Sequence, residues 1–137
     1  MKRQFKLFLL MLGLSVSGSL VLSAQESPAI AKVPFDFRLQ GRSMPQGTYT
    51  ISKLRLGPPF RVTEENGTSL YFNPYGRETA DPDKPVLTFA CYGKECVLAS
   101  LSLPGGEIKY TLNKKQIENN LTRKLGVASM ISVRLQK

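Results

Sequence analysis

The sequence predicts a mostly β protein, an antiparallel β-sandwich or open barrel of about seven or eight strands, with one C-terminal α-helix and a final strand. Three observations carry this prediction. Apolar residues alternate with polar ones at a period of two along most of the chain. Short clusters rich in Gly, Pro and Asn separate these alternating segments. Only one segment places its apolar residues at helical spacing.

The first two strands follow a short polar lead at residues 25–31. Every second residue of 33–39 is apolar, which predicts one half-buried strand. The next strand is predicted over residues 48–56, where the apolar positions change parity part of the way along. One extra residue near 52–53 would restore the burial register, so we expect a β-bulge there.

Turn residues predict two hairpins. Asn66 and Gly67 separate two alternating segments, and both residue types tolerate the positive φ that a tight turn requires. Segments 86–92 and 95–103 are largely apolar on both faces, which is typical of strands in the middle of a sheet. Residues 73–85, which contain several prolines and acidic residues, are expected to form a loop between the two hairpins.

One helix is predicted over residues 114–125, after a strand at 108–112. Apolar residues recur at every fourth position of this segment and form one stripe, which predicts a helix packed on the core. They are Ile117, Leu121 and Leu125. Asn113 is the expected N-cap residue and Gly126 the expected left-handed C-terminal cap. A last strand is predicted over 127–135.

Cys91 and Cys96 flank the turn of the second predicted hairpin. If residues 93–94 form a two-residue turn, the two cysteines lie opposite each other at a non-hydrogen-bonded pair, with Cα atoms about 4.5 Å apart. We expect a disulfide bond, which for so short a loop contributes about 2 kcal/mol of stability. The alternative is a redox-active pair, but such pairs normally have two intervening residues at a helix start.

Residues 1–24 have the pattern of a signal peptide: a basic start, an apolar run and small residues that predict cleavage after Ala24. We therefore expect a single β-rich domain at residues 25–137 that is secreted or periplasmic. The alternative is a signal segment kept as an anchor, although its apolar run is slightly short for a spanning helix and contains several serines. Residues 25–137 contain no other segment apolar enough to span a bilayer.

Composition narrows the possible functions. The sequence contains no His, which excludes Ser-His-Asp and Cys-His catalysis and removes the commonest ligand of zinc and copper. Of the 19 basic and 10 acidic residues, three basic residues lie in 1–24, so the mature chain remains basic. Positive charge favours an anionic envelope component or a polysaccharide as partner, although diffuse charge also fits a surface with no specific partner. We expect no cofactor, and no nucleic-acid partner because export separates the chain from it.

Several tyrosines are candidates for a binding site. Stacked aromatic faces bind sugars or bases, and four aromatic residues could form such a platform. They are Tyr71, Phe72, Tyr75 and Tyr92. Core packing explains Phe72, so we take Tyr71 and Tyr75 as the possible ligand-binding residues.

Acidic residues offer two further candidates. Glu78, Asp81 and Asp83 could donate oxygens to calcium, but their spacing matches no standard calcium loop, so a solvated acidic loop is the favoured interpretation. Glu64 and Glu65 could supply the two carboxylates of a glycoside hydrolase. Adjacent strand residues face opposite sides, so these two cannot face one substrate together.

Part of the chain resembles a group of small uncharacterised secreted proteins of acidobacteria. Residues 33–37 (VPFDF), Gly41 and residues 44–51 (MPQGTYTI) resemble the VPFDF-type strand, Gly turn and LPAGTYTV-type strand of that group. Residues 92–94 and the segment from Lys114 resemble its YGD-type hairpin and charged helix. Met replaces the usual Leu at the first position of 44–51, and the cysteine pair is not typical of the group. The resemblance implies bacterial export and a β fold, and no chemical activity.

These observations together predict an exported, non-enzymatic accessory protein that acts by binding or by association with the cell envelope. One alternative is a carbohydrate- or lipid-binding module that uses exposed aromatic residues and basic charge. Another alternative is a hydrolase that uses carboxylates.

Overall fold

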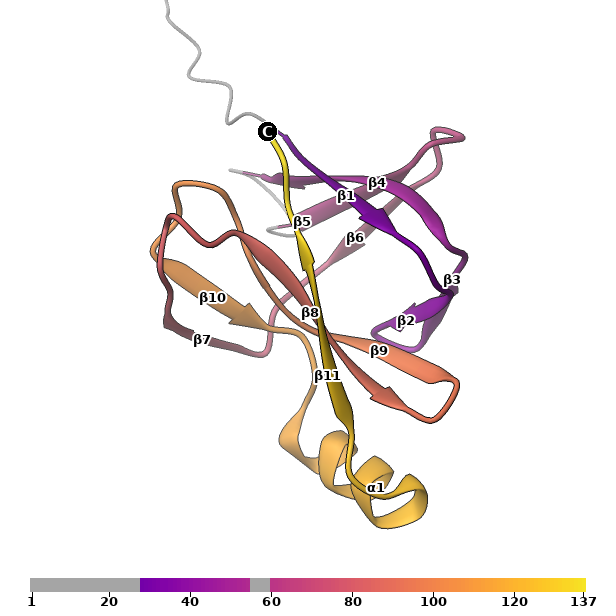
Figure 1. Ribbon diagram of the computed structural model, residues 1–137. Coiled ribbons are helices and arrows are strands. Elements are labelled where there is room, and N and C mark those ends of the chain that lie inside the picture. Colours follow the sequence, from indigo (N-terminus) through magenta and orange to yellow (C-terminus); the bar gives the residue numbers. More distant parts are fainter. Residues whose placement is uncertain (1–27, 55–59) are drawn as a thin grey trace, which may run out of the picture.

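The computed structural model describes residues 28–54 and 60–137 and confirms the predicted fold class (Figure 1). Two sheets pack against each other in a sandwich-like arrangement, with one helix and a C-terminal strand. The predicted signal segment, residues 1–24, lies outside the described residues. Figure 1 shows the helix at the end of the molecule opposite the first sheet.

The first sheet has four antiparallel strands in the order β1-β4-β5-β6. These strands are β1 (Ala29–Val33), β4 (Gly47–Lys53), β5 (Phe60–Glu64) and β6 (Ser69–Phe72). The turn between β5 and β6 contains Asn66 and Gly67 as predicted, and Gly67 has the positive φ of 89° that this turn requires. The Asn66 Oδ1 atom accepts the Thr68 N–H at 2.9 Å and fixes the turn locally.

The second sheet has seven strands, with the order β11-β8-β9-β10-β7 and the β2–β3 hairpin beside β9. These strands are β2 (Phe37–Leu39), β3 (Arg42–Met44), β7 (Gly76–Thr79), β8 (Val86–Tyr92), β9 (Glu95–Ser102), β10 (Ile108–Thr111) and β11 (Ser129–Arg134). The β8–β9 hairpin is central, as its apolar faces predicted. At the edge of the molecule, Ile30 of β1 pairs with Gln136 and joins the two sheets.

The described residues form eleven strands, more than the seven or eight predicted. The segment 33–39 is divided, because Pro34 cannot donate a ladder hydrogen bond and the chain crosses there from the first sheet to the second. The predicted polar lead contains most of β1. The predicted loop at 73–85 contains β7, an edge strand whose largely exposed residues show no apolar alternation.

The bulge predicted near residues 52–53 is wrong. The register between β4 and β5 continues without interruption from Tyr49↔Glu64 to Lys53↔Phe60. The strand ends at Lys53, so the change of apolar parity beyond it needs no compensation inside the sheet. Leu54 and Leu56, whose parity suggested the bulge, both follow the end of β4, and Leu56 lies outside the described residues. A register shift occurs instead between β8 and β9, next to Thr88.

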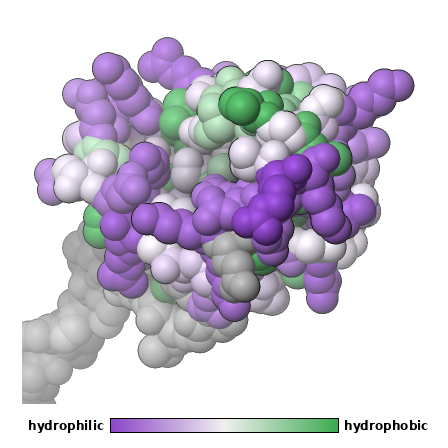
Figure 2. All heavy atoms as spheres, turned by 90° about the horizontal axis from the view of Figure 1, so that it is seen from below, coloured by the Kyte–Doolittle hydropathy of each residue, from purple (hydrophilic) through white to green (hydrophobic). Residues whose placement is uncertain are grey.

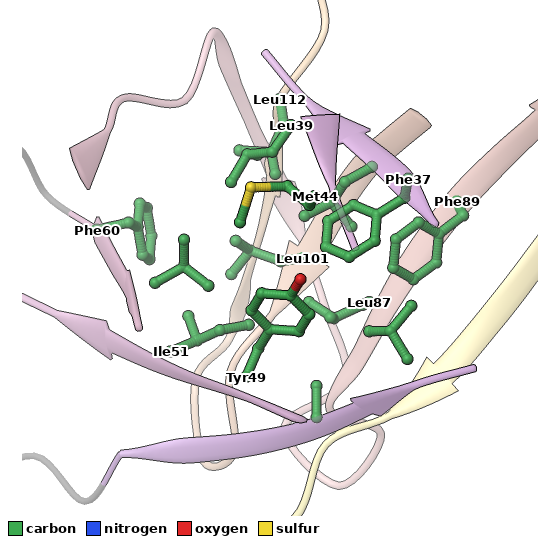
Figure 3. Packing of buried hydrophobic residues seen from close by; sticks show 14 of the residues in the cluster. Phe37, Leu39, Met44, Tyr49, Ile51, Phe60, Leu87, Phe89, Leu101 and Leu112 are labelled. Carbon is green, nitrogen blue, oxygen red and sulfur yellow. The ribbon is translucent and has the colours of Figure 1, made fainter. Parts of the chain in front are cut away.

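The core lies between the two sheets, where side chains from both sheets point toward one another (Figure 3). Phe89 of β8 is fully buried and contacts Phe35 and Phe37 edge to face, with ring centres 5.0 and 5.2 Å apart. Phe60 of β5 packs between Phe72 and Tyr110, at 5.4 and 4.7 Å. Aromatic rings from both sheets therefore supply much of the packing that joins them.

Tyr49 places a polar group within this core. Its hydroxyl group donates a hydrogen bond to the Pro45 carbonyl oxygen, which satisfies the buried O–H. Burial, reinforced by the negative charges of Glu64 and Asp36, raises the pKa of Tyr49 to about 12. The residue is therefore a neutral packing group at physiological pH.

The helix α1 (Lys115–Leu125) begins one residue later than its capping pattern suggested. Leu112 is fully buried and its N–H donates to Ala99 O, so Asn113 is still held against the sheet. Lys114 is the N-cap residue and makes no side-chain cap bond, so the prediction of Asn113 as N-cap is wrong. Gly126 ends the helix at the predicted position, with a positive φ of 88° and its N–H bonded to Thr122 O at 3.0 Å, but its ψ of −166° differs from the left-handed cap that was predicted.

The helix packs on the outer face of the second sheet over a small area. A second apolar cluster, separate from the core, consists of Ala90, Tyr92 and Ala99 on the sheet, covered by Leu121 and Ala128. Only the middle residue of the predicted apolar stripe takes part in this cluster. Ile117 and Leu125, on either side of it, remain about half exposed, so the stripe is not the core face that the sequence predicted.

Candidate functional site

The two cysteines form the predicted disulfide at the end of the central hairpin. Cys91 and Cys96 are cross-strand partners, and Tyr92 and Glu95 are the next pair toward the turn. The Cα atoms of Cys91 and Cys96 are 4.0 Å apart, and both cysteines are buried as part of the main core. A buried position leaves little surface for an exchange partner to reach the sulfur atoms, which favours a structural role over a redox role.

The four aromatic residues considered for a platform do not come together. Phe72 belongs to the main core, and Tyr92 is covered by the helix. Tyr71 and Tyr75 are 51% and 53% exposed, so both remain candidates for ligand contact. Tyr71 pairs within the first sheet, whereas the Tyr75 N–H donates to Thr111 O of the second sheet, so the two rings are held by different sheets.

Tyr71 stands on the outer face of the first sheet among polar side chains. It is the cross-strand partner of Arg61, which is in turn the partner of Ser52. The Arg61 Nε atom is buried and has no hydrogen-bond partner among the described residues. In the next row the hydroxyl oxygens of Thr63 and Ser69 lie 3.0 Å apart. Because the Arg61 Nε atom is buried, the groups open to a ligand here are one aromatic face and the nearby hydroxyl groups, which together can bind a polar ring.

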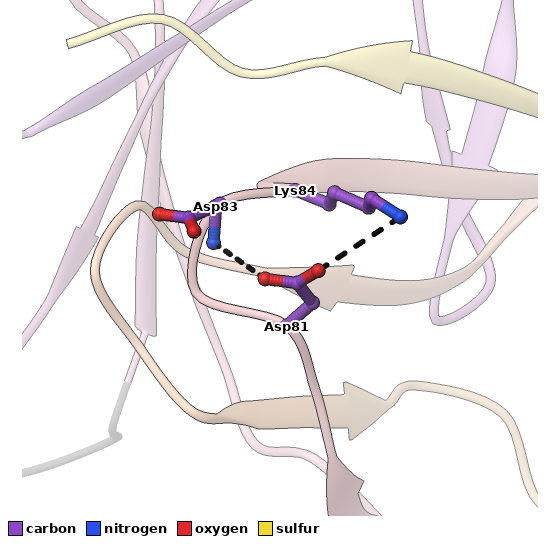
Figure 4. A network of polar contacts seen from close by, with 3 residues as sticks. All are labelled: Asp81, Asp83 and Lys84. Atoms are coloured by element: carbon purple, nitrogen blue, oxygen red, sulfur yellow. Dashed lines mark hydrogen bonds and ion pairs between the residues drawn. The ribbon is translucent and has the colours of Figure 1, made fainter.

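The acidic residues considered for calcium are engaged separately. The Asp81 carboxylate accepts the Asp83 N–H at 2.9 Å and lies 3.8 Å from the Lys84 ammonium (Figure 4). Glu78, on β7, pairs with Lys109 at 2.7 Å, and this contact lowers the pKa of the Glu78 carboxyl group. In the part of the chain that the structure describes, no three acidic or cysteine residues are placed to hold a metal ion.

The two carboxylates considered for hydrolysis lie where β5 ends. Glu64 is partly buried, and its Oε2 atom accepts a bond from Asn66 Nδ2 at 3.3 Å, whereas Glu65 is exposed in the turn. Nothing in this arrangement brings the two carboxylates onto one substrate.

A cleft of about 350 Å³ opens beside the loop that joins β9 to β10. Its side-chain lining includes Ile51, Lys53, Leu103, Glu107, Tyr110 and Lys137. The Lys53 ammonium lies 5.7 Å from the centre of the Tyr110 ring and partly closes one wall. Among the described lining residues Glu107 is the sole acidic side chain, so the cleft lacks a pair of carboxylates for acid–base chemistry.

The most unusual surface of the described chain lies on α1 and β11, and we call it the C-terminal surface. It consists of the exposed large apolar residues Ile117, Leu125, Val127 and Met130. Ile131, also partly exposed, lies on the opposite, core-facing side of β11 as the partner of Phe89. Val127 is 91% exposed and Met130 is 61% exposed. Figure 2, which views the molecule from the helix end, shows hydrophobic residues gathered in one area and bordered by hydrophilic ones. Clustered exposed apolar residues of this kind mark contact surfaces.

Basic residues are concentrated in the same part of the chain. Residues 114–137 contain six basic residues and one acidic residue, whereas residues 25–113 contain ten and nine. The basic residues are Lys114, Lys115, Arg123, Lys124, Arg134 and Lys137. Most of the excess positive charge expected for the mature chain therefore lies in residues 114–137, and four of the six basic residues lie on α1 or directly before it.

The sequence pattern did not identify the C-terminal surface. Apolar residues at helical spacing are normally buried, so the stripe was assigned to the core. Two features of the sequence could have identified it: the local excess of basic residues, and Met130, which lies outside the helical stripe and the alternating positions of the last strand.

Comparison of the chain with known protein families, curated proteins and solved structures found no match. Within residues 28–54 and 60–137, no helix has both the length and the apolar character needed to cross a membrane.

Proposed function

We propose that this chain is an exported, non-enzymatic accessory protein that acts by association with the cell envelope, and that it binds through the C-terminal surface. The observation that carries the proposal is the set of large apolar side chains left exposed on α1 and β11 beside a local excess of positive charge. A folded chain gains nothing by exposing Val127 and Met130 to water, so a partner that covers them explains their presence.

Export is supported by the signal-peptide pattern of residues 1–24 and by the disulfide between Cys91 and Cys96. The resemblance to small secreted acidobacterial proteins points the same way. A binding role is favoured over catalysis because the carboxylates of the described residues are engaged separately or stand alone, and because the sequence lacks His.

The test compares two variants for retention in the envelope fraction after export. Val127→Ser combined with Met130→Ser removes the most exposed apolar groups, and we expect the protein to move from the envelope fraction to the released fraction. Lys32→Ser combined with Arg42→Ser is the matched control, because it changes two exposed residues on β1 and β3, away from this surface, and should leave retention unchanged. Equal retention of the Val127→Ser, Met130→Ser variant and the wild type would contradict the proposal, as would recovery of reduced full-length chain from the cytosol.

A second function, carbohydrate binding, is favoured by the outer face of the first sheet. Tyr71 presents half of its surface there, beside the hydroxyl groups of Thr63 and Ser69. A tyrosine ring stacks on a sugar face, and serine and threonine hydroxyl groups exchange hydrogen bonds with sugar hydroxyl groups.

A glycan array tests this second function. We expect Tyr71→Ala to abolish binding to any glycan that the wild type retains, while Tyr71→Phe keeps the aromatic face and most of the affinity. Tyr75→Ala serves as the comparison, because its ring belongs to the other sheet. If the wild-type protein binds no acidic or neutral glycan on the array, the proposal of carbohydrate binding is contradicted.

A further inference from the structure

We propose that the C-terminal surface docks on the face of an anionic lipid bilayer, with its apolar side chains in the headgroup–acyl boundary and its basic side chains on the lipid phosphates. This inference rests on the proposed function and names the partner.

The distribution of apolar residues fits shallow insertion. Leu121 and Ala128 hold the helix and its following turn on the sheet, which leaves Ile117 and Leu125 half exposed on either side. The turn then carries Val127, the most exposed large apolar residue of the described chain. Met130 follows on the edge strand β11. A protruding apolar turn flanked by half-exposed residues can enter the outer few ångströms of a bilayer without any change of fold.

The charge distribution identifies the lipid as anionic. Lys114, Lys115, Arg123 and Lys124, which lie on α1 or directly before it, form no ion pair within the described chain. Arg134 lies at the far end of β11 and Lys137 lines the cleft beside Ile51, so neither belongs to this basic group. The unpaired cations therefore remain available to phosphate groups, and each basic residue close to an anionic surface strengthens binding about fivefold. The Lys114 ammonium lies 5.2 Å from the centre of the half-exposed Tyr75 ring, and tyrosine is enriched at membrane interfaces.

The same charges argue against a second copy of the chain as the occupant. The free edge of β11 could pair with another β11, which would bury the apolar residues of both copies. Such a dimer would also bring two sets of unpaired basic residues together with one acidic residue each, and like charges at close range repel. An anionic surface satisfies both the apolar and the basic residues, whereas a second copy satisfies only the apolar ones.

The test is a vesicle co-sedimentation titration with the exported protein, purified as the cell releases it. Vesicles of phosphatidylcholine alone are compared with vesicles of phosphatidylcholine mixed with phosphatidylglycerol. We expect binding to the mixed vesicles that weakens as salt is added, and little binding to phosphatidylcholine alone. All variants share the same N-terminal residues, so the differences between them report the C-terminal surface.

Two variants and one control separate the contributions. Arg123→Gln with Lys124→Gln should weaken binding to the mixed vesicles about 25-fold. Val127→Ser with Met130→Ser should weaken it about tenfold or more, because the apolar contribution is lost. Lys32→Gln with Arg42→Gln removes the same charge from exposed positions on β1 and β3 and should change the affinity about twofold or less.

Four results would overturn the inference. Equal binding by all variants would show that the C-terminal surface does not contact the vesicle. Equal binding to both kinds of vesicle would show that the anionic headgroup is not required. A stable dimer in analytical ultracentrifugation that Val127→Ser with Met130→Ser dissociates assigns the surface to a second copy. If the envelope retention described above depends on this surface while the vesicles bind nothing, the proposed function stands and the lipid partner is wrong.

Discussion

The β8–β9 hairpin and the α1–β11 unit both contain large apolar residues, yet one is enclosed and the other is exposed. The hairpin lies in the middle of the larger sheet, with the core on one face and the helix on part of the other. The α1–β11 unit lies at the margin, where β11 is an edge strand and α1 has only one neighbouring layer. The two regions differ in position and also in apolar content, since 11 of the 17 residues of 86–102 are apolar against 8 of the 20 residues of 115–134.

This contrast shows what an apolar sequence pattern predicts and what it does not. Periodicity shows which side chains share a face, but burial requires a second layer to cover that face. β8 has such layers on both sides. α1 uses its only layer to cover Ala90, Tyr92 and Ala99 and leaves its flanking residues in water. Exposed apolar residues at the end of the chain therefore indicate either a missing partner or a cost in stability.

The strongest way to test the contrast uses two residues that are cross-strand partners. Phe89 of β8 and Ile131 of β11 pair in register, but Phe89 is 0% exposed and Ile131 is 39% exposed. We expect Phe89→Ala to lower the free energy of unfolding by about 3–5 kcal/mol and Ile131→Ala by only about 1 kcal/mol. Urea denaturation measures both. Equal losses would show that the edge strand is as enclosed as its neighbour.

Removing the disulfide tests how much it stabilises the enclosed β8–β9 hairpin. Cys91 and Cys96 are five positions apart, so their bond closes a short loop. Replacing both by Ala should lower the free energy of unfolding by about 2 kcal/mol, because the unfolded chain gains conformational freedom. Thermal unfolding of wild type and double variant, each with and without reductant, checks this value. A reductant effect that persists in the double variant would assign the loss to something other than this bond.

The dependence of stability on alkaline pH tests the burial of Tyr49 in the core. Burial raises the pKa of Tyr49 in the folded chain to about 12, above its ordinary value of 10.0. The neutral form is therefore favoured by folding, so this contribution to stability is complete below about pH 10 and is lost as the pH rises toward about 12. Comparing the stability of wild type and Tyr49→Phe from pH 8 upward isolates it, because other groups titrate equally in both. Parallel curves through this interval would contradict the raised pKa.

The smallest change in the free energy of unfolding is expected for exposed residues that belong to neither apolar cluster. Val127→Ser with Met130→Ser changes two side chains that are 91% and 61% exposed. The free energy of unfolding should change by about 0.5 kcal/mol or less, since neither residue belongs to an apolar cluster. A loss well above this in urea denaturation would mean that these residues pack against the fold, which would remove the reason to propose a partner.

The sequence predicted the parts of the fold that depend on local pattern. The β8–β9 hairpin and its cysteine pair follow from alternation, turn residues and spacing. The division of residues 33–39 between two sheets could not be predicted, because Val33 and Phe37 point into the same core from different layers. β7 was missed because its four residues, Gly-Arg-Glu-Thr, are polar or small and its pairing with β10 depends on tertiary position.

The candidate site was predicted only in part. Tyr71 and Tyr75 are exposed as a ligand contact requires, but no pattern in the sequence placed them on different sheets. The C-terminal surface was not predicted, because an apolar helical stripe was assumed to be a core face. Periodicity does not show how much of such a stripe the neighbouring layer covers. The clustering of basic residues after residue 113 was visible in the sequence, and its meaning depends on the exposed apolar residues beside it.

Hydrogen exchange measured by mass spectrometry tests the central claim most directly, because it follows both regions in one sample. Without lipid, we expect the amides of β8 and β9 to exchange slowest and those of α1 and the edge strand β11 to exchange faster. With anionic vesicles added, protection should rise in α1, the turn after it and β11, and stay unchanged in β8 and β9. Slow exchange throughout the free protein, or vesicle-induced protection on the first sheet instead, would contradict the claim that the C-terminal surface awaits a partner.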